Sequence, residues 1–214
     1  MTSLLTLTLP SRRALLVGAA IVLALGLLGT AGWFWYASEQ QRAMAAYADA
    51  MTQVQAATKR QGSPEARAAA IRRLEIVIER YPSAPVAAQV AYELGNLRYA
   101  AREYTQARGA YEIAIAKGAT PTVRALARAG VAYAWEAERN FPKAVDAFQA
   151  ALAGRAPTDF LYEELLLGLA RTQELAGRKA DAVATYRRIL KEGHLSRRAD
   201  EVRFRLASLG VSAD

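Results

Sequence analysis

The sequence predicts an all-α protein in which an N-terminal transmembrane helix is followed by an α-solenoid of about four helix pairs and a C-terminal capping helix. Three observations lead to this prediction. A long stretch near the N-terminus lacks charged residues, apolar residues elsewhere recur at spacings of three and four, and glycine and proline interrupt the chain at regular intervals. Spacings of three and four are those of an amphipathic helix, and no segment shows the strict alternation of a half-buried strand.

The first predicted element is a transmembrane helix over residues 14–37, preceded by a tail of residues 1–13. The stretch contains no charged residue, and at about 1.5 Å per residue it forms a helix of roughly 36 Å, which is enough to span a hydrocarbon core. Ser11 is placed to cap its start. The residues that fit the two membrane interfaces are Arg12 and Arg13 at one end and Trp33, Trp35 and Tyr36 at the other.

Basic residues set the predicted topology. Arg12 and Arg13 lie within one turn of the span, whereas the first twenty residues beyond it contain only Arg42 as a basic residue. The positive-inside rule therefore places residues 1–13 in the cytoplasm and the chain from about residue 38 outside it.

A cleaved signal peptide is the alternative reading of the same stretch, with Gly29 or Ala31 at the cleavage site. The apolar run is longer than the usual signal-peptide core of about 7 to 15 residues. Cleavage there also leaves the aromatic run Trp33–Tyr36 unexplained, so the membrane anchor is favoured.

Residues 38–191 are predicted to form the repeat domain. Breaks that contain glycine or proline separate helices of about 12 to 20 residues, and such short turns force successive helices to run antiparallel. Ser63-Pro64-Glu65 is a clear start signal, because it combines a capping serine, a proline in the first turn and an acid near the positive end of the helix dipole. The predicted pairs cover about 38–80, 84–117, 121–153 and 158–191, and residues 192–214 form a capping helix and tail.

The second helix of each predicted pair carries the clearest repeat. A small residue is followed four positions later by a large one and three positions after that by a small or aliphatic one. Two helices cross closely where a small side chain faces the partner, and the bulky residue one turn later fills the space between neighbouring pairs. The four copies are Ala70, Leu74 and Val77; Ala107, Tyr111 and Ala114; Ala144, Phe148 and Ala151; and Ala182, Tyr186 and Ile189.

The first helix of three pairs carries two adjacent residues, a leucine or alanine and then a small residue, which we call the small-residue step. In two of the three copies an aromatic residue follows. The copies are Leu94-Gly95 with Tyr104, Ala129-Gly130 with Tyr133 and Phe141, and Leu169-Ala170 before Gly177. Together with the second-helix series, this pattern over roughly residues 40–191 resembles the tetratricopeptide repeat. Three departures stand out: Arg98 where an aromatic is usual, about two extra residues before Phe141, and no leucine-glycine step in the first pair.

Composition excludes most catalytic chemistry. The chain has no cysteine and one histidine, His194, so it offers no thiol nucleophile, no cysteine-based metal site and no pair of imidazoles. Glu163 and Glu164 are adjacent and point about 100° apart on a helix, so they do not form a facing acid–base pair. No glycine-rich phosphate loop is present. We therefore expect no enzyme activity, no cofactor and no metal.

The basic residues are spread over all the helices. Twenty-three of the 28 are arginines, and they form no basic stripe with stacking aromatics, so nucleic-acid binding is not expected. Beyond residue 37 the net charge is +6, from 26 basic and 20 acidic residues.

The resemblance to tetratricopeptide repeats implies a concave, peptide-binding face made by the first helix of each pair. Aromatics, amides and arginines there suit apolar side chains, backbone groups and carboxylates. The alternative is that these are ordinary exposed helix residues. The positions carried over from the family are Gln89, Tyr92, Asn96 and Tyr99 in one repeat, Arg124, Val131 and Trp135 in the next, and Glu164, Arg171 and Glu174 in the last.

The whole layout looks like the ancillary Sec-translocon subunit family of Gram-negative bacteria. The similarity rests on a short tail, one span ending in Gly32-Trp-Phe-Trp-Tyr, a linking helix with Gln40-Gln41 and Ala45-Ala46-Tyr47, and degenerate repeats. It implies a single-pass inner-membrane protein whose periplasmic repeats bind translocon subunits, periplasmic chaperones or exported chains. An adaptor for outer-membrane biogenesis, cytochrome maturation or division, and a non-catalytic subunit of a membrane enzyme, are the alternatives, because fold does not fix function.

Overall fold

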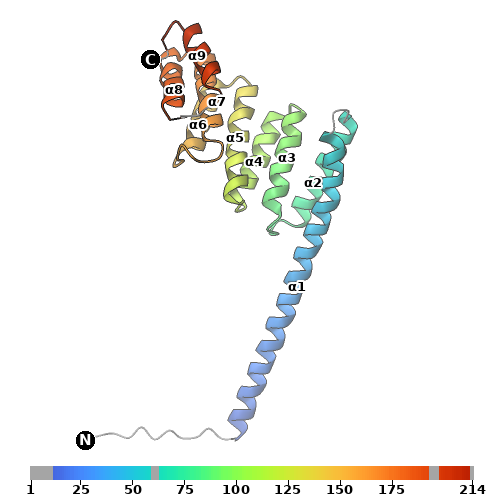
Figure 1. The fold of residues 1–214 in the computed structure, drawn as a ribbon. Coiled ribbons are helices and arrows are strands. Elements are labelled where there is room, and N and C mark those ends of the chain that lie inside the picture. Colours follow the sequence, from blue (N-terminus) through green and yellow to red (C-terminus); the bar gives the residue numbers. More distant parts are fainter. Residues whose placement is uncertain (1–11, 59–62, 193–197, 213–214) are drawn as a thin grey trace, which may run out of the picture. The chain divides into compact units, whose positions relative to one another are not determined.

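The computed structural model describes residues 12–58, 63–192 and 198–212, and all regular secondary structure within these ranges is helical. The predicted all-α fold is therefore confirmed. Ser11 and His194 lie outside the described residues. The described part of the chain contains nine helices (Figure 1): α1 Arg12–Thr58, α2 Pro64–Arg80, α3 Ala87–Ala100, α4 Tyr104–Ala116, α5 Pro121–Ala137, α6 Phe141–Leu152, α7 Tyr162–Leu175, α8 Lys179–Glu192 and α9 Ala199–Ser208.

The chain divides into two compact units, Met1–Arg42 and Ala43–Asp214. In the first unit, the described part of α1 includes a segment that is long and apolar enough to cross a membrane. Its large apolar side chains are exposed, with Leu23 at 68% and Leu28 at 71%. Membrane anchors and signal sequences share this length and composition.

The second unit is a succession of antiparallel helix pairs. Within it, α1 from Ala43 onward precedes α2, and the pairs α3–α4, α5–α6 and α7–α8 follow, with α9 packed on α8 (Figure 1). Neighbouring first helices, α3 with α5 and α5 with α7, approach each other more closely than neighbouring second helices do. The first helices therefore line the inner side of the curved stack, as in other α-solenoids.

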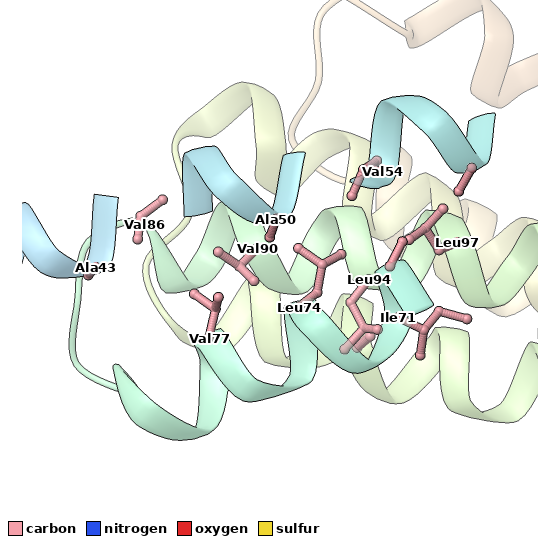
Figure 2. Close-up of a cluster of buried hydrophobic side chains, with 13 residues drawn as sticks. Ala43, Ala50, Val54, Ile71, Leu74, Val77, Val86, Val90, Leu94 and Leu97 are labelled. Carbon is pink, nitrogen blue, oxygen red and sulfur yellow. The ribbon is translucent and has the colours of Figure 1, made fainter. Parts of the chain in front are cut away.

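The beginning of this unit has its own core, formed by α1, α2 and α3 (Figure 2). Ala43 and Ala50 on α1 are fully buried and belong to this core. Leu74 on α2 and Val90 on α3 fill the space between the helices and are also fully buried. The N-terminus of α2 is capped as the sequence predicts, because the Ser63 hydroxyl accepts a hydrogen bond from the backbone N–H of Ala66 at 3.2 Å.

The repeated residues of the second helices are core residues. All twelve are buried, and the four alanines that begin the series are completely inaccessible. The aromatic of one pair also reaches the first helix of the next pair. A Cβ atom on Gly130 of α5 would lie 2.6 Å from the ring of Tyr111, and one on Gly168 of α7 would lie 2.5 Å from the ring of Phe148. Glycine at these two positions lets adjacent pairs stack on a large ring.

The turn inside each pair repeats in detail. Arg102, Arg139 and Gly177 follow α3, α5 and α7 and adopt left-handed backbone conformations, with φ of 63°, 61° and 73°. In each turn the next residue's N–H donates to the carbonyl five residues before it, at 2.9, 3.0 and 2.8 Å. This is a Schellman-type helix end, in which the left-handed residue satisfies otherwise unpaired carbonyls.

These turns correct the repeat register that we assigned to α5. Leu94 and Leu169 each lie eight residues before the left-handed residue, and the residue eight before Arg139 is Val131, followed by the fully buried Ala132. The small-residue step of α5 is therefore Val131-Ala132, not Ala129-Gly130. No insertion precedes Phe141, because it follows Arg139 by two residues, just as Tyr104 follows Arg102.

Replacing Arg102 with glycine is expected to raise the free energy of unfolding by about 0.5–1 kcal/mol, because a left-handed conformation strains a side chain with a Cβ but not glycine. Gly177→Ala at the equivalent turn should lower it by about 1 kcal/mol. Urea unfolding of the full chain in detergent, followed by circular dichroism, measures both changes. Equal stabilities for Arg102→Gly and the natural chain would contradict the strain assigned to this turn.

Candidate functional site

Two adjoining pockets lie along α3, α5 and α7, on the inner side of the second unit. The first, here called the aromatic pocket, has a volume of about 230 Å³, and the second, the arginine pocket, about 290 Å³. Tyr99 and Tyr133 line both, so the two pockets form one groove. Tyr92, Asn96, Tyr111, Leu126, Ala129, Gly130 and Leu161 complete the aromatic pocket, and Glu136, Ala137, Arg139, Phe141, Arg171 and Leu175 complete the arginine pocket.

Tyr111 of α4 forms the base of the aromatic pocket. Its ring lies against Gly95 of α3 and Gly130 of α5, and its hydroxyl donates to Oδ1 of Asn96 at 3.0 Å. The Tyr92 ring centre lies 6.0 Å from the Tyr111 ring centre. Burial raises the pKa of the Tyr111 hydroxyl above its ordinary value, so the floor of this pocket stays uncharged at neutral pH.

Tyr133 connects the pockets and is fixed by two neighbours. Its hydroxyl donates to Oε1 of Glu164 at 2.9 Å, and its ring stands edge-on to that of Phe148, with centres 5.1 Å apart. Burial, followed by the charge of Glu164, raises the pKa of Tyr133, so this hydroxyl also remains protonated. Glu164 in turn pairs with Arg198, at 2.8 Å between Oε2 and Nη1. This ring is thus a rigid part of the groove wall.

The arginine pocket contains two arginines in different states. Arg171 of α7 donates through Nε and Nη2 to both carboxylate oxygens of Glu136 on α5, at 2.8 and 2.9 Å. Such a two-pronged pair fixes both side chains, and hydrogen bonding to Glu136 raises the pKa of Arg171. Arg139 is exposed, and its side chain makes no hydrogen bond or ion pair with the residues that the structure describes.

Four of the ten residues that we expected in the groove line it: Tyr92, Asn96, Tyr99 and Arg171. Gln89 lies nearby on α3 and donates to Oε1 of Glu93 at 2.9 Å. Glu164 supports the groove from behind, through Tyr133.

The structure does not bring the other four expected residues to these pockets. Val131 packs against the buried cluster around Tyr111, and Arg124 donates to the carbonyl oxygen of Ala119 at 3.0 Å. Oε2 of Glu174 lies 3.9 Å from Nη1 of Arg205 on α9. The guanidinium carbon of Arg108 lies 3.5 Å from the centre of the Trp135 ring, and the ammonium nitrogen of Lys143 lies 4.4 Å from it. The Trp135 ring therefore faces α4 and α6.

The register shift explains the missed residues on α5. The positions equivalent to Gln89, Tyr92, Asn96 and Tyr99 are each 37 residues later, as Arg139 is to Arg102, and they are Leu126, Ala129, Tyr133 and Glu136. All four line the groove. The spacing of the turns, rather than the glycine on α5, was the signal that could have found them.

The predicted membrane-interface residues lie on α1. Arg12 and Arg13 are exposed at its start, and the aromatic side chains Trp33, Trp35 and Tyr36 are 67%, 70% and 54% exposed. Within the described ranges, no three histidine, cysteine, aspartate or glutamate side chains are grouped as metal ligands would be.

Alkaline pH is expected to unfold the second unit through its buried tyrosines. Because burial raises the folded-state pKa of Tyr111, its contribution to stability is fully present below the unfolded pKa of about 10 and is lost as the pH rises above it. The free energy of unfolding should be flat from pH 7 to 9 and then fall, by up to about 1.4 kcal/mol per pH unit for Tyr111. Urea unfolding at each pH measures this, and Tyr111→Phe should have the shallower slope; identical slopes would contradict the assignment.

The comparisons with known proteins agree with this architecture. A search of curated proteins finds no match to the chain. The family described as "Tetratricopeptide repeat-like domain" matches residues 12–211, which is most of the chain. The helix pairs, their repeated left-handed turns and the small-to-large contacts between pairs fit that match. The chain belongs to the tetratricopeptide repeat-like domain family.

Proposed function

We propose that the protein is a membrane-anchored, non-enzymatic scaffold that binds a segment of a partner protein in the groove along α3, α5 and α7. Domains of this family imply protein–protein interaction. The observation that carries the proposal is the groove itself, which is lined by tyrosines, an amide and arginines on the inner side of the helix stack. Such a mixture suits an unfolded or helical segment, since aromatics take apolar side chains and the polar groups fix orientation.

The anchor in this proposal is the apolar part of α1. Its side chains are exposed from Leu15 to Tyr36, which suits lipid contact, and the aromatic residues Trp33, Trp35 and Tyr36 suit a headgroup layer. Arg12 and Arg13 favour a cytoplasmic N-terminus, which leaves the repeat unit outside the cytoplasm, in the periplasm of a Gram-negative cell. The absence of cysteine means that no disulfide supports the repeat unit in that compartment.

The chain itself makes the topology easy to test, because it has no cysteine. Single cysteines at the exposed Ala150 and, in a second variant, at Ser3 give unambiguous labelling sites. In intact cells with a permeabilised outer membrane, a membrane-impermeant maleimide should label the Ala150→Cys protein and not the Ser3→Cys protein. The reverse labelling would overturn the topology, and loss of the N-terminal segment from the mature protein would identify a signal peptide.

For the partner, we propose the Sec translocon, with periplasmic chaperones or exported chains as the segments that reach the groove. The support is the layout of tail, single span, linking helix and degenerate repeats, which is similar to that of ancillary translocon subunits. Affinity purification of the full chain from gently solubilised membranes, with identification of the copurified proteins, tests this. Recovery of translocon subunits or chaperones is the expected result. Specific recovery of an outer-membrane, cytochrome-maturation or division complex, or of a membrane enzyme, would overturn the translocon assignment.

A further inference from the structure

The groove has an uneven distribution of charge. At the arginine pocket, Arg171 is neutralised by its two hydrogen bonds to Glu136, which leaves the exposed Arg139 as a cation whose charge no described side chain balances. At the other side, beyond Asn96, lies the carboxylate of Glu93, which lines neither pocket and accepts hydrogen bonds from two amides, that of Gln89 at 2.9 Å and that of Asn96 at 3.4 Å. A bound segment therefore meets a guanidinium at one end of the groove, and at the other end a carboxylate lies behind the lining residue Asn96.

Between these two ends lies the aromatic pocket, which carries no charged lining residue. Leu126, Ala129 and Leu161 give it an apolar wall, and Tyr111 and Tyr133 have hydroxyls that are already hydrogen-bonded within the protein. The volume of about 230 Å³ is large enough for one leucine or phenylalanine side chain. Burying such a side chain contributes about 1.5–3 kcal/mol.

We propose that the groove selects an extended segment in which an apolar side chain and a carboxylate lie two residues apart. The apolar side chain enters the aromatic pocket and the carboxylate pairs with Arg139 in the arginine pocket. This inference rests on the proposed function, since it names the class of segment that the same groove takes. Tyr99 and Tyr133 line both pockets, so the two side chains must come from neighbouring residues of one strand. Residues two apart in an extended chain face the same way at about 7 Å, which suits adjoining pockets.

The polarity of the groove also fixes the direction in which the segment binds. A carboxylate placed near Asn96 would face the charge of Glu93, whereas one at the arginine pocket meets the guanidinium of Arg139. Like charges repel and opposite charges form charge-assisted hydrogen bonds, so binding in the reverse direction is disfavoured. A segment with lysine in place of the acid loses the pairing and is repelled.

A dye-labelled peptide, Gly-Ser-Leu-Ser-Asp-Ser-Gly, is the probe that tests this, titrated with the full chain in detergent and followed by fluorescence anisotropy. Replacing its aspartate with asparagine should weaken binding about fivefold, and lysine should weaken it further. Replacing its leucine with serine should weaken binding at least tenfold. The aspartate effect should shrink at high salt, because exposed charges are screened.

The chain offers a matched pair of variants for the arginine. Arg102 and Arg139 occupy the same left-handed turn position in successive pairs, but only Arg139 lines the groove. Arg139→Asn and Arg102→Asn remove the same charge, and asparagine tolerates the left-handed conformation. Arg139→Asn should lose the preference for aspartate over asparagine in the probe, and Arg102→Asn should keep it.

The outcomes separate this inference from the proposed function. Equal binding of the aspartate, asparagine and lysine probes, with the leucine still required, would overturn the carboxylate selection and leave the groove as a binding site. Equal loss of preference in Arg102→Asn and Arg139→Asn would overturn the role of Arg139. Failure of every probe, at up to 1 mM of chain that is folded by circular dichroism, would overturn the selected class of segment, and the proposed function would then depend on the partner captured from membranes.

Discussion

Phe148→Ala is expected to lower the free energy of unfolding by about 4 kcal/mol, because truncating a buried phenylalanine removes its burial and leaves a cavity. Phe148 on α6 is completely inaccessible to solvent. Its ring lies against Gly168 of α7 and edge-on to Tyr133 of α5, so it joins two successive helix pairs. Gly168 has no side chain that could fill the space. Urea unfolding of the full chain in detergent, followed by circular dichroism, measures the change.

Phe204→Ala is the matched control for this prediction. Phe204 on α9 is 71% exposed, so the same truncation should change the free energy of unfolding by less than about 0.5 kcal/mol. Similar losses in the two variants, or a loss below about 1 kcal/mol for Phe148→Ala, would show that the contact between pairs does not hold the stack together.

Leu126→Arg is expected to reduce partner recovery at least tenfold in affinity purification from membranes. Leu126 is half-buried in the wall of the aromatic pocket, and a long cationic side chain there fills the space that an apolar side chain of the partner would occupy. The arginine stem can lie along the pocket wall with its charge in water, so the loss in the free energy of unfolding should stay near 1 kcal/mol. Quantification of copurified partner against bait measures the effect.

Ile113→Arg provides the control for the change in charge and size. Ile113 lies on α4, a second helix, is 38% exposed and does not line either pocket. Partner recovery by this variant should equal that of the natural chain. An equal loss in Ile113→Arg, or full recovery by Leu126→Arg, would place the binding surface outside the groove.

The sequence predicted the second helices more reliably than the first helices. Ala107, Tyr111 and Ala114 and their three sets of counterparts face the core, so their spacing is set by packing within the repeat and can be read directly. The glycine on α5 is explained by contact with the preceding helix pair, not by packing within its own pair. Gly130 accommodates the Tyr111 ring of the preceding pair, so the neighbour determines it, and reading it as part of the repeat's own step moved the α5 register by two residues.

The groove was only partly predictable for related reasons. Tyr92, Asn96 and Tyr99 were found because α3 carries the clearest repeat pattern. Trp135 was predicted to face the groove, but its ring lies against cations from α4 and α6 instead, and the α5 sequence alone does not reveal these contacts. Leu161 enters the aromatic pocket from the connection before α7, where its backbone has a φ of 69°. Leucine is an uncommon residue in that conformation, so no turn signal in the sequence points to it.

Site-specific photo-crosslinking in membranes tests the central claim, that a protein segment binds in the groove, most directly. A photoreactive phenylalanine derivative replaces Tyr99, which lines both pockets, or, in a separate chain, Ile113 on the outer helix α4. The account predicts a protein crosslink from position 99 that disappears when Leu126→Arg is added, and no crosslink of comparable yield from position 113. Crosslinking from position 113 alone, or crosslinking from position 99 that Leu126→Arg leaves unchanged, would contradict it.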